Sequence, residues 1–266
     1  MLPRFLQDSL DRRTIERWAP HPEVWKELLP RVPLLRGLDT AEAEALRTTT
    51  GLILGRKDIH GAQGQEVSDA MRLMIAVQAA LPVLNLGLDW YRNWSSIIVY
   101  PGEFTTRHVW MDNAGVVHEQ ERSLVGEAIH GGPVVLSWQD SRDDLDPEAE
   151  GNVVIHEFAH KLDMLNGNDI NGFPPLHRGM PTEPWTRAFS SAYADLSLRV
   201  EQGDPTAIDP YAAYDEGEFF AVCMETFFVD PLTLRSSYPG VYEQLRQWLR
   251  QDPAARGERA MPLPSG

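Results

Sequence analysis

The stretch Val153-Val154-Ile155-His156-Glu157-Phe158-Ala159-His160-Lys161-Leu162 is the most informative part of this sequence, because it places an H-E-x-x-H motif inside an apolar run. Residues four apart lie on the same face of an α-helix, one turn above each other, so both imidazoles can reach one metal ion. Glu157 lies beside them, where its carboxylate can take a proton from a water molecule that the metal activates. This pattern is typical of zinc-dependent peptidases.

The apolar neighbours of the motif favour this interpretation. A helix that is apolar nearly all round is buried, and burying two histidines and a glutamate without partners is costly. A metal ion relieves that cost directly. The alternative is a surface helix with two solvated histidines, which the apolar flanks disfavour. Lys161 departs from the pattern, because many zinc peptidases have an uncharged residue at that position.

The third metal ligand has to come from elsewhere in the chain, since a catalytic zinc usually has three protein ligands and one open position. The metzincin extension H-E-x-x-H-x-x-G-x-x-H fails here, because Asp163 and Asn166 occupy its glycine and last histidine positions. Glu218 begins a run that otherwise looks buried, and Glu225 lies two helical turns further along the same face. The spacing favours Glu218 as the ligand. It leaves Glu225 as the alternative, or as a carboxylate that orients a ligand.

Asp163 shares the helix face of both histidines, because it follows His160 by three residues and His156 by seven. It can accept a proton from a ligand imidazole and so fix the tautomer of that ring. An ordinary helix carboxylate paired with a nearby base explains the position equally well.

Composition narrows the class of protein. The 266 residues allow one large domain or two small ones, and the net charge of −15 disfavours direct binding to nucleic acid or to an anionic membrane. Every apolar run is too short to span a bilayer, and the first residues lack the apolar core of a signal peptide. Cys223 is the only cysteine, so no internal disulfide forms. These features predict a cytoplasmic protein.

The periodicity predicts an α+β fold that is mainly helical, with a small mixed β-sheet beside the H-E-x-x-H helix. The motif helix is expected from Asp146-Pro147 to about Leu165. The other expected elements are strands at 97–100, 104–110, 116–122 and 134–138, and later helices at 182–196, 216–227 and 239–249. The strand from Val134 to Trp138 is expected to offer its edge to an extended substrate.

Several segments resemble the Mlc titration factor A family of bacterial cytoplasmic zinc metallopeptidases. The resemblance rests on the motif through Met164, Tyr211-Ala212-Ala213 and Glu218-Phe219-Phe220-Ala221-Val222, with further similarity at 98–102 and 132–138. It implies a zincin-like catalytic domain at 84–252, preceded by an N-terminal helical region at 1–83 that packs on it. The tail at 253–266 carries no motif and is expected to be disordered.

The resemblance also implies roles for single residues. It makes Glu218 the third ligand and Tyr211 the group that stabilises the oxyanion, whereas sequence alone favours a hydrogen-bonded core tyrosine at Tyr211. Together with the motif it predicts a zinc peptidase with one catalytic Zn²⁺ and a peptide or protein substrate, and aminopeptidase-like action is the mode that it suggests. It further implies a partner, a transcriptional repressor of the Mlc type that controls sugar uptake. The alternative is a regulatory protein-binding module whose zinc site is structural or latent.

Overall fold

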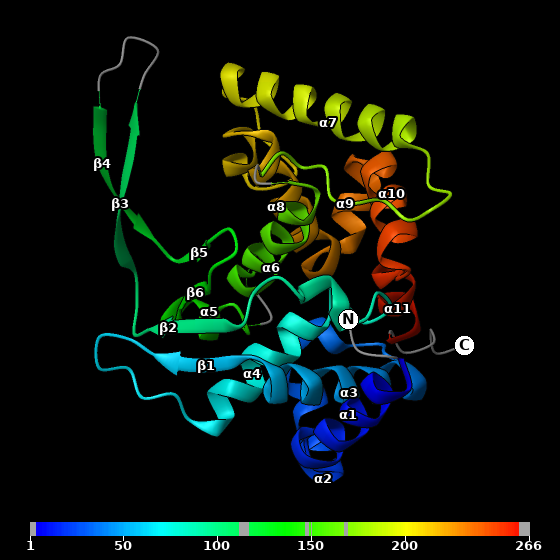
Figure 1. The fold of residues 1–266 in the computed structure, drawn as a ribbon. Coiled ribbons are helices and arrows are strands. Elements are labelled where there is room, and N and C mark those ends of the chain that lie inside the picture. The colour runs from blue at the N-terminus through cyan, green and yellow to red at the C-terminus, as the bar shows by residue number, and fades with distance from the viewer. Residues whose placement is uncertain (1–3, 112–116, 147–148, 150, 168–169, 261–266) are drawn as a thin grey trace.

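The computed structural model describes residues 4–111, 117–146, 149, 151–167 and 170–260. Over these residues the chain is mainly helical, with a small mixed sheet and a separate two-stranded hairpin (Figure 1). The predicted α+β class is therefore confirmed. None of the helices in the described ranges has the length and apolar character needed to cross a membrane.

The elements follow one another with helices at both ends and strands in the middle. The α-helices are α1 (Arg4–Trp18), α2 (Pro22–Leu28), α3 (Thr40–Arg56), α4 (Asp69–Ala80), α5 (Trp138–Asp143), α6 (Val153–Asp163), α7 (Thr182–Gln202), α8 (Glu216–Val229), α9 (Pro231–Ser237), α10 (Pro239–Leu249) and α11 (Pro253–Ala260). Short 3₁₀ helices are η1 (Leu29–Arg31), η2 (Pro33–Leu35), η3 (Leu88–Tyr91), η4 (Met164–Asn166) and η5 (Pro210–Ala213). The strands are β1 (Asp58–Gly61), β2 (Ser96–Tyr100), β3 (Phe104–Met111), β4 (Val117–Leu124), β5 (Gly126–Ala128) and β6 (Val134–Ser137).

The main sheet has the strand order β1-β2-β6-β5. Strands β1, β2 and β6 are parallel, and β5 runs antiparallel to β6 with Gly126 opposite Leu136. The expected substrate edge at Val134 to Trp138 is therefore wrong, because β6 is paired on both sides and Trp138 already begins α5. The outer strand on that side is β5, which is three residues long and contains a glycine, so periodicity does not detect it.

Strands β3 and β4 form the expected antiparallel hairpin, in register from Phe104 opposite Leu124 to Met111 opposite Val117. The hairpin projects away from the helical body (Figure 1). The sequence between the two strands, Asp112-Asn113-Ala114-Gly115, predicts a turn, and it lies outside the described residues.

The motif helix α6 starts later than the expected Asp146-Pro147. It begins at Val153, because the Asn152 side chain accepts a hydrogen bond from the Ile155 N–H at 2.8 Å and caps the helix. Its last turn tightens into η4 and ends at Asn166, close to the expected end.

The buried side chains form one hydrophobic cluster that runs from Trp25 to Ala254. Helix α4 of the N-terminal region packs against α6. On the same side, Phe158 of α6 meets Tyr91 and Trp94 with ring centroids 5.1 and 5.3 Å apart. The N-terminal helices thus share a core with the motif helix, and the division at residue 83 stays a prediction.

The tail from residue 253 is helical over Pro253–Ala260, so the expected disorder is wrong for that segment. Arg256 is 3% exposed, donates to Glu42 of α3 at 2.8 Å and to Gln251 at 3.0 Å, and so ties α11 to the N-terminal region. Glu42 is distant in the sequence and Gln251 belongs to no motif, so the sequence does not reveal these contacts and its composition predicts disorder. Residues 261–266 lie outside the described part of the chain.

Candidate metal centre

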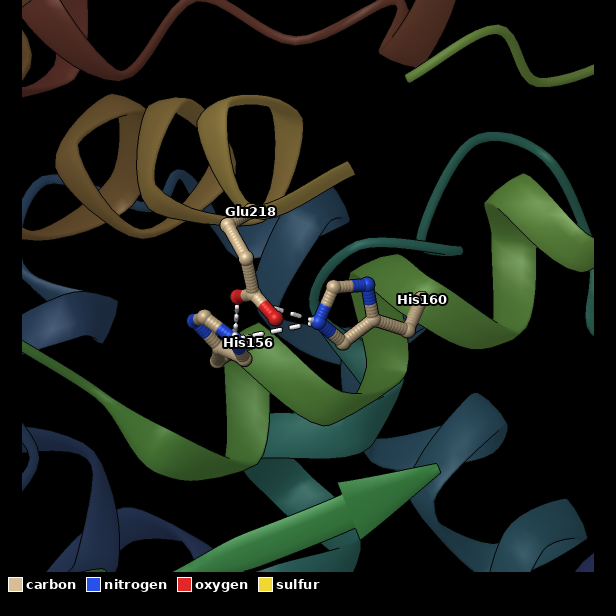
Figure 2. Close-up of side chains that lie close together, drawn as sticks. All are labelled: His156, His160 and Glu218. Carbon is tan, nitrogen blue, oxygen red and sulfur yellow. Dashed lines mark hydrogen bonds and ion pairs between the residues drawn. The ribbon is translucent and has the colours of Figure 1, made fainter. Parts of the chain in front are cut away.

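Two helices bring three donor atoms together between them. His156 and His160 lie one turn apart on α6, and Glu218 reaches down from α8 toward both imidazoles (Figure 2). The distances are 3.0 Å from His156 Nε2 to Glu218 Oε2, 3.5 Å from His160 Nε2 to the same oxygen, and 3.1 Å between the two Nε2 atoms. All three donor atoms lie within 4.8 Å of one another, the arrangement that one metal ion requires.

Glu218 takes this position because α8 begins where the sequence predicts. Asp215 caps the helix by accepting the Glu218 N–H at 2.9 Å, which places Glu218 in the first turn. The following residues are almost all buried, and the helix packs along α6. The apolar run of α8 therefore fixes Glu218, whose carboxylate faces both histidines.

Glu225 lies two turns further along α8 and contacts the other nitrogen of the first histidine. Its Oε1 is 2.6 Å from His156 Nδ1, and its Oε2 accepts the Asn152 N–H at 2.7 Å. A carboxylate on Nδ1 holds the proton there and leaves Nε2 free to donate to a metal. The structure thus places Glu225 at Nδ1 of the His156 ring and Glu218 at its Nε2.

The charges in this cluster suit a cation. Burial opposes ionisation of Glu218, but the hydrogen bonds to His156 and His160 outweigh it and hold the pKa of that carboxyl well below its usual range. Burial also disfavours a charged His156, yet Glu225 and Glu218 beside the ring raise the pKa of His156 well above its usual value. Two imidazole nitrogens and one ionised carboxylate oxygen form a donor set that fits a divalent metal ion.

Glu157 lies next to this donor set with its carboxyl almost fully buried. It is 5% exposed, and its Oε2 finds no hydrogen-bond partner among the described residues. Burial raises the pKa of Glu157, although the two histidines partly offset that effect. Gly126 of β5 makes room for it, since a Cβ there would lie 2.4 Å from Glu157 Oε1. A buried carboxyl with a raised pKa and a vacant oxygen is suited to accept a proton.

Asp163 is placed differently from both expectations. Its oxygens accept the backbone N–H groups of Asn171, Gly172 and Phe173 at 2.8, 2.7 and 2.9 Å. Within the described part of the chain, His160 Nδ1 has no hydrogen-bond partner, so Asp163 does not fix that ring. It anchors a loop instead. Gly172 in that loop packs so tightly on the first residue of α8 that a Cβ would lie 2.5 Å from the Glu216 carbonyl oxygen.

Tyr211 stands at the entrance to the site on η5 rather than in the core. Its side chain is 50% exposed, and its ring centroid is 6.3 Å from that of His156. The ring stacks on Tyr214 at 6.1 Å with 15° between the planes. Partial burial and the nearby Glu218 carboxylate raise the pKa of the Tyr211 phenol, so it keeps its proton and can donate it in a hydrogen bond.

A cleft of about 440 Å³ opens beside His156 and Glu157. Its carboxylates are Glu103, Asp140, Asp144, Asp209, Glu157 and Glu225. A second hollow of about 640 Å³ shares Gly151, Asp209, Val222 and Glu225 with it, so the two lie side by side. The site therefore borders a cleft with an acidic lining.

Three residues that shape the site were not predicted from the sequence. Asn152 carried a recognisable signal, because an asparagine directly before an apolar run is a common helix cap. Gly126 carried a weaker one, since a glycine in a strand often marks a close approach. Lys161 was noted only as a departure. It donates to the carbonyl oxygens of Ile129 and Gly132 at 2.5 and 2.9 Å, and so fixes α6 to the turn between β5 and β6.

The sequence of this chain is similar to those of known proteins. Residues 6–250 match the model of a family described as glucose-regulated metallo-peptidase M90. Mlc titration factor A of Serratia proteamaculans is 37% identical over 237 residues, covering 88% of this chain and 89% of that protein. Mlc titration factor A of Yersinia enterocolitica is 35% identical over 237 residues, covering 88% of each chain. The predicted resemblance is confirmed, and this chain belongs to the glucose-regulated metallo-peptidase M90 family.

Proposed function

We propose that this chain is a zinc-dependent peptidase in which His156, His160 and Glu218 hold one zinc ion and Glu157 acts as general base. The observation that carries the proposal is the convergence of three donor atoms within 4.8 Å, beside a buried Glu157 oxygen that has no partner in the described residues. Helices α6 and α8 share a buried interface, so both halves of the donor set are held on rigid elements.

Zinc is the metal that this donor set favours, because catalytic zinc sites commonly combine two histidines with one carboxylate. When bound, it would lower the pKa of water and polarise the carbonyl of the scissile bond. Glu225 acts on the protein side by holding the proton of His156 on Nδ1.

Proton transfer falls to Glu157. Burial raises the pKa of Glu157 toward neutral pH. The carboxylate can therefore take a proton from water and pass it to the leaving amine. Tyr211 has a protonated phenol at the open side of the cleft, where it can donate a hydrogen bond to the negative charge that develops on the substrate oxygen.

The proposed substrate class rests on the cleft and on the strand beside it. The outer strand β5 lies against α6, and its Gly126 touches the Glu157 side chain. An extended peptide can pair with such a strand, which would hold its scissile bond beside Glu157. The acidic lining attracts cationic groups, including the α-amino group of a peptide. We therefore propose peptide bonds as substrate and aminopeptidase action as the first mode to test.

The test is hydrolysis of a peptide library by the zinc-loaded wild type beside Glu157→Gln, with metal content measured in both. The expected result is cleavage by the wild type only, with zinc bound equally in both proteins. Glu201→Gln, an exposed glutamate at the end of α7, serves as the matched control and should cleave like the wild type. Full activity in Glu157→Gln would remove the proposed base, and the cleavage pattern would separate aminopeptidase from endopeptidase action.

A second function is favoured by the names of the relatives, which are titration factors of Mlc. We propose that this chain also binds a transcriptional repressor of the Mlc type. Calorimetry of purified repressor with wild type and with Glu157→Gln should give the same affinity, since the base is not needed for binding. Binding with no cleavage by the wild type would favour the regulatory module with a latent metal site, and no binding would remove the repressor as partner.

A further inference from the structure

We propose that Gln78, in helix α4 of the N-terminal region, is a positioning residue for the metal centre and acts through Asn152 and Glu225 on His156. The inference rests on the proposed zinc site. It starts from a chain of hydrogen bonds that crosses three helices and ends on a metal-facing imidazole.

The first link is a pair of buried amides. Gln78 and Asn152 are each 1% exposed, and Asn152 Nδ2 donates to Gln78 Oε1 at 2.7 Å. Gln78 Nε2 donates to the Met74 carbonyl oxygen at 3.0 Å, which sets the direction of the glutamine amide. Asn152 Oδ1 accepts the Ile155 N–H at 2.8 Å, which sets the direction of the asparagine amide. Each amide therefore has only one orientation that satisfies its neighbours.

The second link leads to the metal site. The backbone N–H of Asn152 donates to Glu225 Oε2 at 2.7 Å, and Glu225 Oε1 lies 2.6 Å from His156 Nδ1. The position of Asn152 thus decides where one oxygen of Glu225 is held. The other oxygen decides the plane of the His156 ring and hence the direction of Nε2. No proton has to move along this chain, because its role is to hold atoms in place.

The surroundings of Gln78 show that an apolar side chain would be expected there. Its neighbours Ile75, Ala76, Val77 and Ala79 are fully buried, and α4 packs against α6. A buried amide in such a place is tolerated only when its polar atoms are paired. Removing the Gln78 side-chain oxygen would leave the Asn152 amide unpaired at the cap of the motif helix.

The central experiment replaces Gln78 by methionine, an apolar residue of similar length that suits a helix. Zinc affinity of Gln78→Met, measured by chelator competition, is expected to fall about tenfold, the lower end of the loss seen when a group supporting a ligand histidine is removed. The visible spectrum of the cobalt-substituted protein is expected to shift, because the ring plane of His156 changes. Peptide hydrolysis should lose kcat with little change in KM.

Two further variants separate positioning from general destabilisation. Ile53→Ala removes a buried side chain from α3 without touching the hydrogen-bond chain, and should lower stability while leaving zinc affinity and the cobalt spectrum unchanged. Gln78→Asn shortens the side chain and keeps its polarity, so it covers the case in which Gln78→Met does not fold. It should weaken zinc binding to a similar degree.

A double variant tests the route. Once Glu225 is changed to glutamine, adding Gln78→Met should produce no further loss of zinc affinity, because both changes break the same chain. Unchanged zinc affinity in Gln78→Met, an equal loss in Ile53→Ala, or additive losses in the double variant would each overturn the inference while the zinc site stands. A wild type that binds no zinc would overturn the proposed function and the inference together.

Discussion

Tyr211 is the residue whose role differs most between sequence and structure. The sequence alone favours a core tyrosine, but the side chain is half exposed and faces the cleft beside His156. Tyr211→Phe should lower kcat by about 10²–10³-fold, the usual effect of removing one donor to a developing oxyanion. KM and zinc content should stay near wild type. Steady-state kinetics on a peptide substrate measures this.

The matched control for that change is Tyr214→Phe. Tyr214 stacks on Tyr211 and is 59% exposed, so loss of its hydroxyl should leave kcat nearly unchanged. Equal kcat values for the two variants would show that the Tyr211 phenol takes no part in the reaction.

Asp144 makes the stability of the fold depend on pH through the titration of one side chain. Burial raises the pKa of Asp144 to about 7, and the nearby carboxylates of Glu225 and Asp140 add to this, while the hydrogen bond from the Val153 N–H opposes it. The folded state therefore holds this proton more tightly than the unfolded state, whose aspartates titrate near 4. Stability is then lost as the pH rises from about 4 to 7.

Asp144→Asn removes that titration and keeps an oxygen for the Val153 N–H. Urea unfolding at pH 5 and pH 7.5, at fixed metal content, should show the variant gaining on the wild type at the higher pH. The gain should be on the order of 2 kcal/mol, less than the full shift would give because the carboxyl is partly exposed. An identical difference at both pH values would contradict the raised pKa.

At this scale the sequence predicts what depends on local spacing. His156 and His160 follow from a four-residue interval, and Glu218 follows from an apolar run that begins at a carboxylate. Asp163 shows where spacing stops being informative. It shares the expected helix face, yet its partners are backbone N–H groups of a loop that folds back from eight to ten residues away.

Strand β5 leaves room for Glu157, the proposed general base, because Gly126 has no side chain. A Cβ on Gly126 would overlap the Glu157 carboxyl, and that carboxyl is the movable end of a long side chain. Gly126→Ala should therefore displace Glu157 at little cost in stability. We expect kcat to fall at least tenfold with zinc affinity unchanged, because a small displacement of a catalytic group is costly.

Gly102→Ala is the control for that substitution, since its Cβ would lie 3.5 Å from Gln139 Oε1, an ordinary contact. It should behave like the wild type in both kinetics and unfolding. If Gly126→Ala also keeps its kcat, the Glu157 carboxyl tolerates displacement and β5 does not constrain it.

Helix α11 docks through one buried guanidinium. Arg256 is 3% exposed and pairs with Glu42, which is itself largely covered. Arg256→Met should lower the free energy of unfolding by about 2–3 kcal/mol, because Glu42 and Gln251 each lose a charged hydrogen-bond donor. Arg187→Met, which breaks an exposed pair with Glu183, should change it by less than about 1 kcal/mol. Equal small changes in chemical unfolding would mean that the Arg256 guanidinium does not anchor α11.

The helices were predictable where an apolar stripe repeats, and α10 spans the same residues in sequence and structure. Strands β1 and β5 were not predictable. They are four and three residues long, and each pairs with a strand that only the folded sheet brings beside it. The parallel pairing of Asp58 with Ser96 joins residues far apart in the chain, and no local pattern records it.

The whole molecule is held by one core that both the N-terminal helices and the α6–α8 pair enter. The class of fold follows from composition and periodicity, since helical patterns dominate and the strands are few. The order of the strands does not follow from them, because it depends on which strands far apart in the sequence pair with each other. That is why β6 was expected at an edge although it lies inside the sheet.

Metal removal should lower the stability of the whole fold, because the donor atoms come from two helices of the shared core. Zinc at about 100 times its dissociation constant would add about 2.7 kcal/mol to the folded state, which corresponds to a Tm about 5–10 °C higher for a chain of this size. Calorimetry of the wild type with zinc and after chelation measures this. His156→Ala should show the same Tm in both conditions. A Tm of the wild type that is indifferent to zinc would mean that the three donors do not bind the ion across α6 and α8.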